Sequence, residues 1–125
     1  MKLSQTFAES NTGRKRRRNE DSYVCEPPLF AVADGLGGAQ AGEVAASLAA
    51  AALREGAAAS AEHDEAHVVR LIQSANKRVH QRALDDSSAS GMGTTITVAL
   101  FDESGTVVIG HVGDSRAYVL RDGRL

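Results

Sequence analysis

The sequence predicts a fold of the α+β class, with strands and helices in separate parts of the chain. The first observation is a period of two in residues 22–34 and again in 94–121, where apolar and β-branched residues alternate with others. The second is an alanine-rich middle, where apolar residues recur three or four positions apart, as on one face of a helix. The third is size, because 125 residues with 42% hydrophobic and 24% charged residues suit one globular domain at most.

The N-terminal part is predicted to contain two short strands and a basic loop. Residues 3–7 alternate weakly and are expected to form an edge strand, and residues 11–13 read as a turn. The basic run 14–18 follows. Residues 22–25 form the second strand, which the two prolines at 27–28 end because proline cannot donate to a sheet ladder.

The strand that begins at Leu29 and its glycine-rich turn are the centre of the pattern. Side chains alternate along a strand, so Phe30, Val32 and Asp34 are expected on one face, with the first two directed toward the core. Asp34 ends the strand, where burial of a carboxylate is costly unless a cation or donors meet it. Four glycines within residues 35–42 let the backbone approach a ligand, and a carboxylate beside exposed carbonyls suits Mg²⁺ or Mn²⁺.

Two helices are predicted next. The first runs from Glu43 to about Arg54, and its apolar positions recur every four residues: Val44, Leu48 and Ala52. Residues 56–62 form a linker of small residues. Asp64 is expected to cap the second helix, which ends at 85–88. The apolar positions of that helix follow a spacing of three or four: Val68, Ile72, Ala75, Val79 and Ala83.

The C-terminal part is predicted to be β-structure. Residues 94–101 form a β-branched strand, a turn at 102–105 reverses the chain, and residues 106–112 form the return strand. After an interruption at 113–115, residues 116–121 resume as a strand. Asp122 and Gly123 are a strong hairpin turn with two residues behind them, so we expect the chain to stop inside a fold.

Composition excludes several classes of protein. The single cysteine, Cys25, excludes an internal disulfide and fits a reducing compartment. Neither a secretory signal nor an apolar run of about 20 residues is present, so the segment is expected to be cytoplasmic with no membrane span. The five charges of residues 14–18 hide an acidic body, because removing them from the net charge of −2 leaves −7. Nucleic acid is not expected as a partner, since aromatics total 4% and no stacking residue accompanies the basic run.

Other familiar motifs fail on particular residues. Glu43 and Val44 stand where a P-loop needs lysine and serine or threonine. Cys25 has Ala31 six residues later, where a cysteine phosphatase needs arginine. The segment 63–67 resembles the start of a zinc-protease helix, but aspartate replaces its glutamate, so a solvated helix start is expected.

Three acidic points stand at strand ends or turns: residues 20–21, Asp34 and Asp114. Taken singly, each favours a turn residue or a partner of the neighbouring arginines. Taken together with those arginines, they favour a site, because carboxylates that hold divalent cations and a guanidinium that grips phosphate are the groups of metal-assisted phosphoryl transfer.

Five separated motifs closely resemble the bacterial protein phosphatase 2C family of metal-dependent serine/threonine phosphatases. They lie at 16–21, 31–38, 42–47, 91–95 and 112–116. The resemblance implies a four-layer αββα sandwich, two antiparallel sheets between helix layers. It also implies that residues 1–125 are about the N-terminal half of one such domain, truncated at the C-terminus.

The resemblance also implies a metal centre of two Mn²⁺ or Mg²⁺ ions, with a third in bacterial members. Asp34 matches the carboxylate that bridges both metals, and Gly35 matches the residue that offers its carbonyl. Glu20 and Asp21 match the acidic pair that supports the site, mostly through waters. Asp114 matches the ligand of the weaker third metal.

For the reaction, the resemblance implies hydrolysis of phosphoserine and phosphothreonine on proteins, the substrates of bacterial serine/threonine kinases. A metal-activated water attacks phosphorus directly, and Arg16 matches the arginine that binds the substrate phosphate. Leu36 stands where eukaryotic relatives carry a histidine, and the family's later metal-binding aspartates have no counterpart here, so this chain alone is expected to be a poor phosphatase. The alternative is a non-catalytic fragment or regulatory relative that binds phosphoprotein or metal without turnover.

Overall fold

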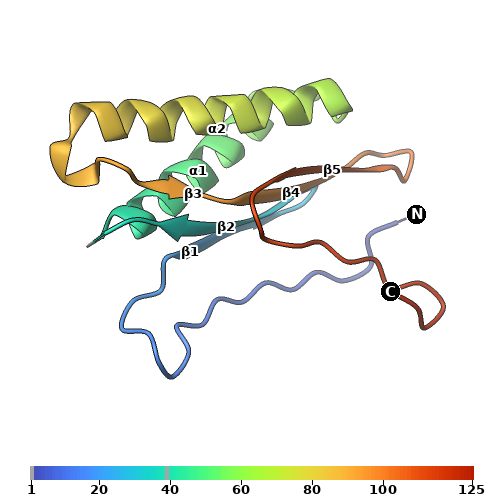
Figure 1. Ribbon diagram of the computed structural model, residues 1–125. Helices are drawn as coiled ribbons and strands as arrows, with labels where there is room; N and C mark the ends of the chain where they lie inside the picture. Colours follow the sequence, from blue (N-terminus) through green and yellow to red (C-terminus); the bar gives the residue numbers. More distant parts are fainter. Residues whose placement is uncertain (1, 39) are drawn as a thin grey trace.

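The computed structural model describes residues 2–38 and 40–125 and consists of one antiparallel sheet with two helices on one face (Figure 1). The sheet has the strand order β1-β2-β4-β5, with β3 paired to β2. Its strands are β1 Asp21–Glu26, β2 Leu29–Leu36, β3 Gly93–Thr94, β4 Ile96–Phe101 and β5 Val107–Val112. The helices are α1 Ala41–Ala58 and α2 Glu65–Asp85, and a short 3₁₀ turn, Ser87–Ala89, follows α2. The α+β class is therefore confirmed.

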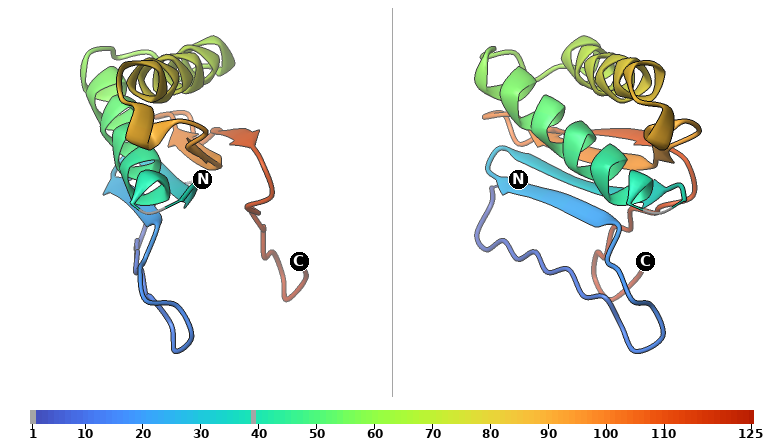
Figure 2. Two further views of the ribbon diagram at one scale, coloured as in Figure 1. Left: turned by 60° about the vertical axis from the view of Figure 1, so that its left-hand side comes forward. Right: turned by 90° about the vertical axis from the view of Figure 1, so that its left-hand side faces the viewer.

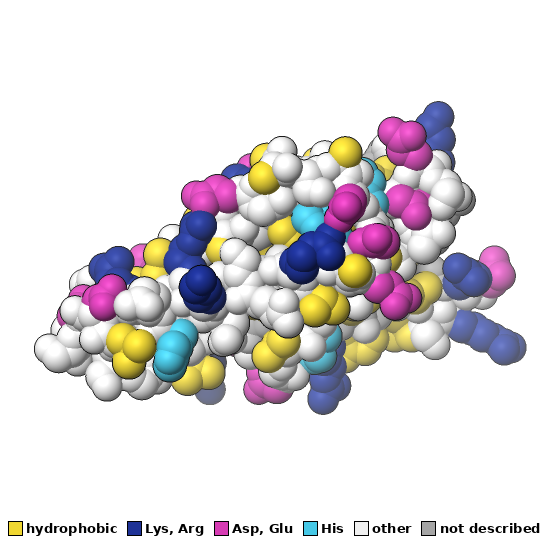
Figure 3. All heavy atoms as spheres, turned by 90° about the horizontal axis from the view of Figure 1, so that it is seen from above, with side chains coloured by type: hydrophobic (Ala, Val, Ile, Leu, Met, Phe, Trp, Pro, Cys, Tyr) yellow, Lys and Arg dark blue, Asp and Glu magenta, His cyan; other side chains and the backbone are white. Residues whose placement is uncertain are grey.

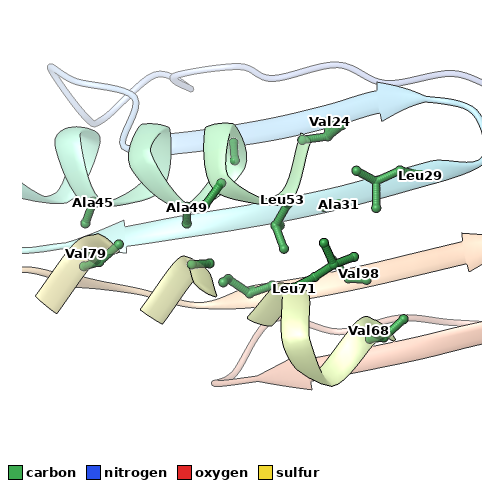
Figure 4. Packing of buried hydrophobic residues seen from close by; sticks show 14 of the residues in the cluster. Val24, Leu29, Ala31, Ala45, Ala49, Leu53, Val68, Leu71, Val79 and Val98 are labelled. Carbon is green, nitrogen blue, oxygen red and sulfur yellow. The ribbon is translucent and has the colours of Figure 1, made fainter. Parts of the chain in front are cut away.

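The core lies between the sheet and the two helices, which pack side by side on the sheet (Figure 2). Small residues make this close packing possible. Ala31 of β2 and Ala49 and Leu53 of α1 belong to one buried cluster, which also includes Val98 of β4 and Leu71 of α2 (Figure 4). Burial of this apolar area, at about 25 cal/mol per Å², is the main stabilising contribution to the fold.

The face of β2 that points to this core is the opposite of the predicted one. Leu29, Ala31 and Ala33 are buried, whereas Val32 is 48% exposed. The prediction was wrong because it directed the larger side chains toward the core, while the helices need alanines beneath them to approach the strand closely. Asp34 lies on the same exposed face as Val32, as alternation requires.

The second face of the sheet carries apolar side chains with no helix over them in the described residues. Phe30 and Phe101 pack edge to face with their ring centroids 5.6 Å apart. Ile109 on β5 is 51% exposed. The described residues thus form a helix layer and one sheet, which are two of the four layers that the resemblance implies.

Two segments expected to be strands are not. Residues 3–7 and 116–120 have no regular structure, and both run along the uncovered side of the sheet (Figure 1). Neither segment pairs with β1 or β5, the strands at the two edges of the sheet, so neither has the ladder of hydrogen bonds that makes a strand. The turn at Asp122 and Gly123 does form, with φ of +52° and +77°, and joins Arg121 to Arg124 by two backbone hydrogen bonds.

The helix predictions are confirmed in kind but not in length. α1 begins two residues before Glu43 and continues to Ala58, so the first part of the predicted linker is helical. Gly56 lets this last part of α1 pack closely on α2, because a Cβ atom there would lie 2.6 Å from Leu71 Cδ2 of α2. Where the chain is described, neither helix is long and apolar enough to cross a membrane.

The start of α2 is capped as predicted. The Asp64 side chain accepts a hydrogen bond of 2.8 Å from the backbone N–H of His67. The expected solvated helix start is found at Asp64, Glu65 and Ala66, which are exposed, whereas His67 is only 5% exposed. Burial of His67 follows from the helical period, because Leu71 and Ala75 are buried at four-residue steps beyond it.

Candidate metal and phosphate site

The pairing of β1 with β2 places two carboxylates side by side at one end of the sheet. Asp21 lies directly opposite Asp34, so the two side chains share a face. Burial, and then the hydrogen bond and the charge of Asp34, raise the pKa of Asp21, while the Arg16 guanidinium acts in the opposite direction. Two carboxylates held this closely repel one another unless a proton or a cation lies between them.

Close backbone contacts hold the turn after β2 against the start of α1. The Gly35 N–H donates to the Glu20 carbonyl at 2.9 Å. A Cβ atom on Gly35 would lie 1.8 Å from the Gly42 carbonyl oxygen, and one on Gly42 would lie 2.6 Å from Glu20 Oε2. Glu20 therefore packs on the first turn of α1, where the helix dipole favours a negative charge.

Thr95, between β3 and β4, fixes the end of β2. Its Oγ1 accepts from the Asp34 N–H at 3.0 Å, and its own N–H donates to the Asp34 carbonyl at 2.9 Å. The same hydroxyl lies 2.7 Å from Ser115 Oγ. Gly113 packs on this side chain, since a Cβ atom there would lie 2.6 Å from Thr95 Cγ2. Thr95 thus connects the strand end that carries Asp34 to the turn that carries Asp114.

Sequence reasoning missed Thr95 and Ser115 as structural residues of the site. Both stand inside motifs that the family resemblance singled out, and neither was given a role. No local signal marks Thr95, because it stands within the unbroken β-branched run of residues 94–98, and Ser115 stands in the predicted interruption at 113–115.

An open pocket of about 600 Å³ forms where these elements meet. Five of the six predicted site residues line it: Arg16, Glu20, Asp34, Gly35 and Asp114. Asp21 instead lines an adjoining pocket of about 250 Å³, which Asp34 and Ser115 share. Arg17, Arg18 and Leu36 also line the larger pocket. Residues from four separate motifs therefore meet at one end of the sheet.

The donor set fits a hard cation but is incomplete. Carboxylate and carbonyl oxygens are what Mg²⁺ and Mn²⁺ prefer, and no cysteine or histidine lines the larger pocket. Within the described residues, no three His, Cys, Asp or Glu side chains come close enough together to hold a metal ion. Asp21 and Asp34 thus provide a carboxylate pair, whereas a divalent cation needs about six oxygen ligands, some of them waters.

Replacing Thr95 by valine, which keeps the branched shape and removes the hydroxyl, is expected to loosen the site. The Asp34 N–H then loses its partner, so we expect the free energy of unfolding to fall by about 1–3 kcal/mol and Mn²⁺ affinity to fall about tenfold. Denaturant unfolding and titration calorimetry on the full-length protein measure the two effects. Thr95→Ser should restore both.

Thr97→Val is the matched control for this substitution, because it removes a hydroxyl that contacts only His111 Nδ1, at 2.9 Å, on the next strand. It should leave Mn²⁺ affinity unchanged. Equal affinities in the Thr95→Val variant and the wild type would show that Thr95 does not position the site.

The comparisons with known proteins identify the family. Residues 14–125 match the family model described as protein phosphatase 2C, and the chain belongs to this family. It is 39% identical over 124 residues to serine/threonine protein phosphatase PstP of Mycobacterium tuberculosis strain H37Rv, covering 94% of this chain and 23% of that protein. It is 37% identical over 123 residues to serine/threonine phosphatase stp of Listeria innocua, covering 90% of this chain and 48% of that protein.

Solved structures agree with the fold. The catalytic domain of PstP in complex with two manganese ions matches with a TM-score of 0.84 and 38% identity, over 92% of this chain and 50% of that chain. Stp1 of Staphylococcus aureus matches with a TM-score of 0.74 and 31% identity, over 97% and 52%. The chain therefore spans about half or less of the length of these relatives and contains the first part of their fold.

Proposed function

We propose that the protein containing this chain hydrolyses phosphoserine and phosphothreonine on proteins. The observation that carries the proposal is the meeting of carboxylates and guanidinium groups in one pocket, with Asp34 opposite Asp21 and Arg16 close to both. Carboxylates of this kind hold divalent cations, and an arginine binds two oxygens of a phosphate group at once. Similarity to named serine/threonine phosphatases supports the same reaction.

Each residue of the site is assigned one task in the proposal. Asp34 and Gly35 hold two Mn²⁺ or Mg²⁺ ions, for which the manganese-bound relative is the support. Glu20 and Asp21 bind the waters around them, and Asp114 holds a third ion. When bound, the metals provide an activated water and neutralise charge that develops on the phosphate.

The chain's own residues position the substrate. Arg16 lies near enough to Asp21 to affect its pKa and lines the pocket, so it can orient a phosphate beside the carboxylates. Phosphoproteins made by serine/threonine kinases would be the partners. A cytoplasmic location fits a chain whose one cysteine, Cys25, forms no disulfide.

Release of inorganic phosphate from a phosphothreonine peptide, with and without Mn²⁺, tests this proposal on the full-length protein. Manganese-dependent release is expected. Binding of the peptide or the metal, with no release of phosphate under any metal, would instead support a non-catalytic relative. This is the alternative that the incomplete set of metal ligands within the described residues favours.

Replacing Arg16 by alanine is expected to raise KM for the peptide more than it lowers kcat. Loss of one charge-assisted contact to phosphate corresponds to roughly 1.5–3 kcal/mol. Steady-state kinetics measure the effect, with Arg17→Ala as the control, for which a small and salt-sensitive change is expected because screening weakens exposed charges. Equal losses in both variants would indicate a diffuse basic patch in place of a phosphate ligand.

A further inference from the structure

The pocket has more guanidinium groups than one phosphate needs. Arg16, Arg17 and Arg18 all line it. A phosphate monoester is held well by one bidentate arginine together with metal ions, and Arg16 has that task in the proposed function. Arg17 and Arg18 place additional positive charge in the same pocket.

Neither Arg17 nor Arg18 forms an ion pair with an acidic side chain in the described part of the chain. They share this with Arg16, and they differ from the paired arginines of the two helices. The ion pairs found in the described part of the chain lie elsewhere: Arg54–Glu26, Arg70–Glu62, Arg78–Glu55 and Arg82–Asp86. On the helix side of the molecule, basic and acidic side chains are accordingly interspersed (Figure 3). The charge at Arg17 and Arg18 is thus left available to a ligand.

The Arg18 guanidinium nevertheless lies within hydrogen-bonding distance of the Gln40 amide. With the Gln40 amide oriented so that its oxygen faces the guanidinium, this oxygen accepts from Arg18 Nη1 at 2.9 Å and from Nη2 at 3.1 Å. Gln40 is the residue before α1, and its side chain makes no capping hydrogen bond to the helix. A neutral amide orients the guanidinium without cancelling its charge, which a carboxylate in the same place would do.

The same pocket disfavours a nucleic acid as the source of negative charge. Its lining alternates arginines with Glu20, Asp34 and Asp114, so it is not the continuous basic surface that binds a run of phosphates. No aromatic side chain lines it, so bases would have nothing to stack on. A short anionic group beside a single phosphorylated residue fits this mixture of charges better.

We propose that the site prefers phosphorylated protein segments that carry a second negative group, a carboxylate or another phosphate, close to the phosphorylated residue. Arg18, oriented by Gln40, contacts this second group, and Arg17 adds to the attraction. The inference rests on the proposed function, because it names the substrate class of the same site.

Two phosphothreonine peptides test the inference on the full-length protein. They differ only in their neighbouring residues, which are Asp and Glu in one and Asn and Gln in the other. At low ionic strength we expect kcat/KM to be about three- to tenfold higher for the acidic peptide, the effect of one or two exposed charge pairs. The ratio should fall toward one at about 0.5 M salt, because screening shortens the range of charges.

Three variants test whether Arg18 and Gln40 cause the preference for the acidic peptide. Arg18→Gln removes the charge, and Gln40→Glu keeps Arg18 but gives it an internal carboxylate partner, so each should bring the ratio of kcat/KM values close to one. Arg14→Gln makes the same change of charge at a position that does not line the pocket, and it should keep the wild-type ratio. Because the readout is a ratio, a general loss of activity cancels.

The outcomes separate this inference from the proposed function. Equal kcat/KM values for both peptides, or an equal drop in the ratio in Arg14→Gln and Arg18→Gln, would overturn the inference while phosphatase activity stands. Absence of turnover on both peptides would overturn the proposed function. The inference would then be judged by dissociation constants from fluorescence anisotropy, which should still show tighter binding of the acidic peptide. Tighter binding of a single-stranded DNA of equal charge, lost in Arg18→Gln, would also overturn the inference.

Discussion

Replacement of Asp34 by asparagine is expected to abolish manganese-dependent phosphate release by the full-length protein. Asparagine keeps the shape of the side chain and removes its charge, and Asp34 lies near the C-terminal end of β2, opposite Asp21, the second carboxylate of the pair. A metal ion contributes several kcal/mol of charge stabilisation to phosphoryl transfer. We therefore expect kcat/KM to fall about a thousandfold or more, which corresponds to about 4 kcal/mol.

The fold should survive this change, because Asp34 is exposed and its backbone bonds to Thr95 do not involve its carboxylate. Circular dichroism and calorimetric Mn²⁺ titration accompany the kinetics. Asp122→Asn is a matched control, since Asp122 occupies a turn at positive φ that asparagine also adopts and lies outside the pocket. An Asp34→Asn variant that keeps more than a tenth of the wild-type Mn²⁺ affinity and turnover would remove Asp34 from the metal centre.

The parts of the fold that sequence predicted well are those that a few neighbouring residues determine. The Asp64 cap and the turn at Asp122 and Gly123 depend on side-chain hydrogen bonding and on backbone sterics within four residues. The exposed face of Asp34 likewise follows from the alternation along β2, although the strand continues two residues beyond Asp34, to Leu36, where the sequence predicted a turn. Local rules of this kind need no knowledge of the rest of the protein.

The failures concern features that depend on partners distant in the chain. Alternation along β2 separated its two faces, but only the helices decide that the alanine face is the buried one. Residues 116–120 have strand-forming composition, yet a strand exists only where another strand accepts its hydrogen bonds. The role of Thr95 depends on contacts with Asp34 and Ser115, 61 and 20 residues away along the chain.

The candidate site shows the same division. Residue types and motif order predicted the acidic residues and Arg16 as members of a site, because their chemistry is visible in the sequence. Their arrangement was not visible: Asp21 lies in an adjoining pocket, and Asp114 is linked to Asp34 through Ser115 and Thr95. Gly35 has a further reason to be glycine that the sequence could not show, namely its contact with α1.

Gly35→Ala is expected to damage both the fold and the site. The added Cβ would lie 1.8 Å from the Gly42 carbonyl oxygen and 2.9 Å from that of Glu20, and both are backbone atoms that cannot rotate away. Relief of the clash requires β2 to separate from the first turn of α1, which also displaces the Glu20 carboxylate. We expect the free energy of unfolding to fall by about 3 kcal/mol, the upper end for an overpacked site.

Denaturant unfolding of the full-length protein and calorimetric Mn²⁺ titration measure these two losses together. Gly38→Ala is the control from the same turn, because a Cβ atom there would have no neighbour within 4 Å and its φ is not positive. It should change stability by less than about 0.5 kcal/mol, as surface substitutions usually do. A Gly35→Ala variant that unfolds at the wild-type denaturant midpoint and binds Mn²⁺ normally would contradict this prediction. It would show that the end of β2 and the start of α1 are not packed together as the glycine contacts indicate. The arrangement of Glu20 beside Asp34 would then have to be abandoned as well.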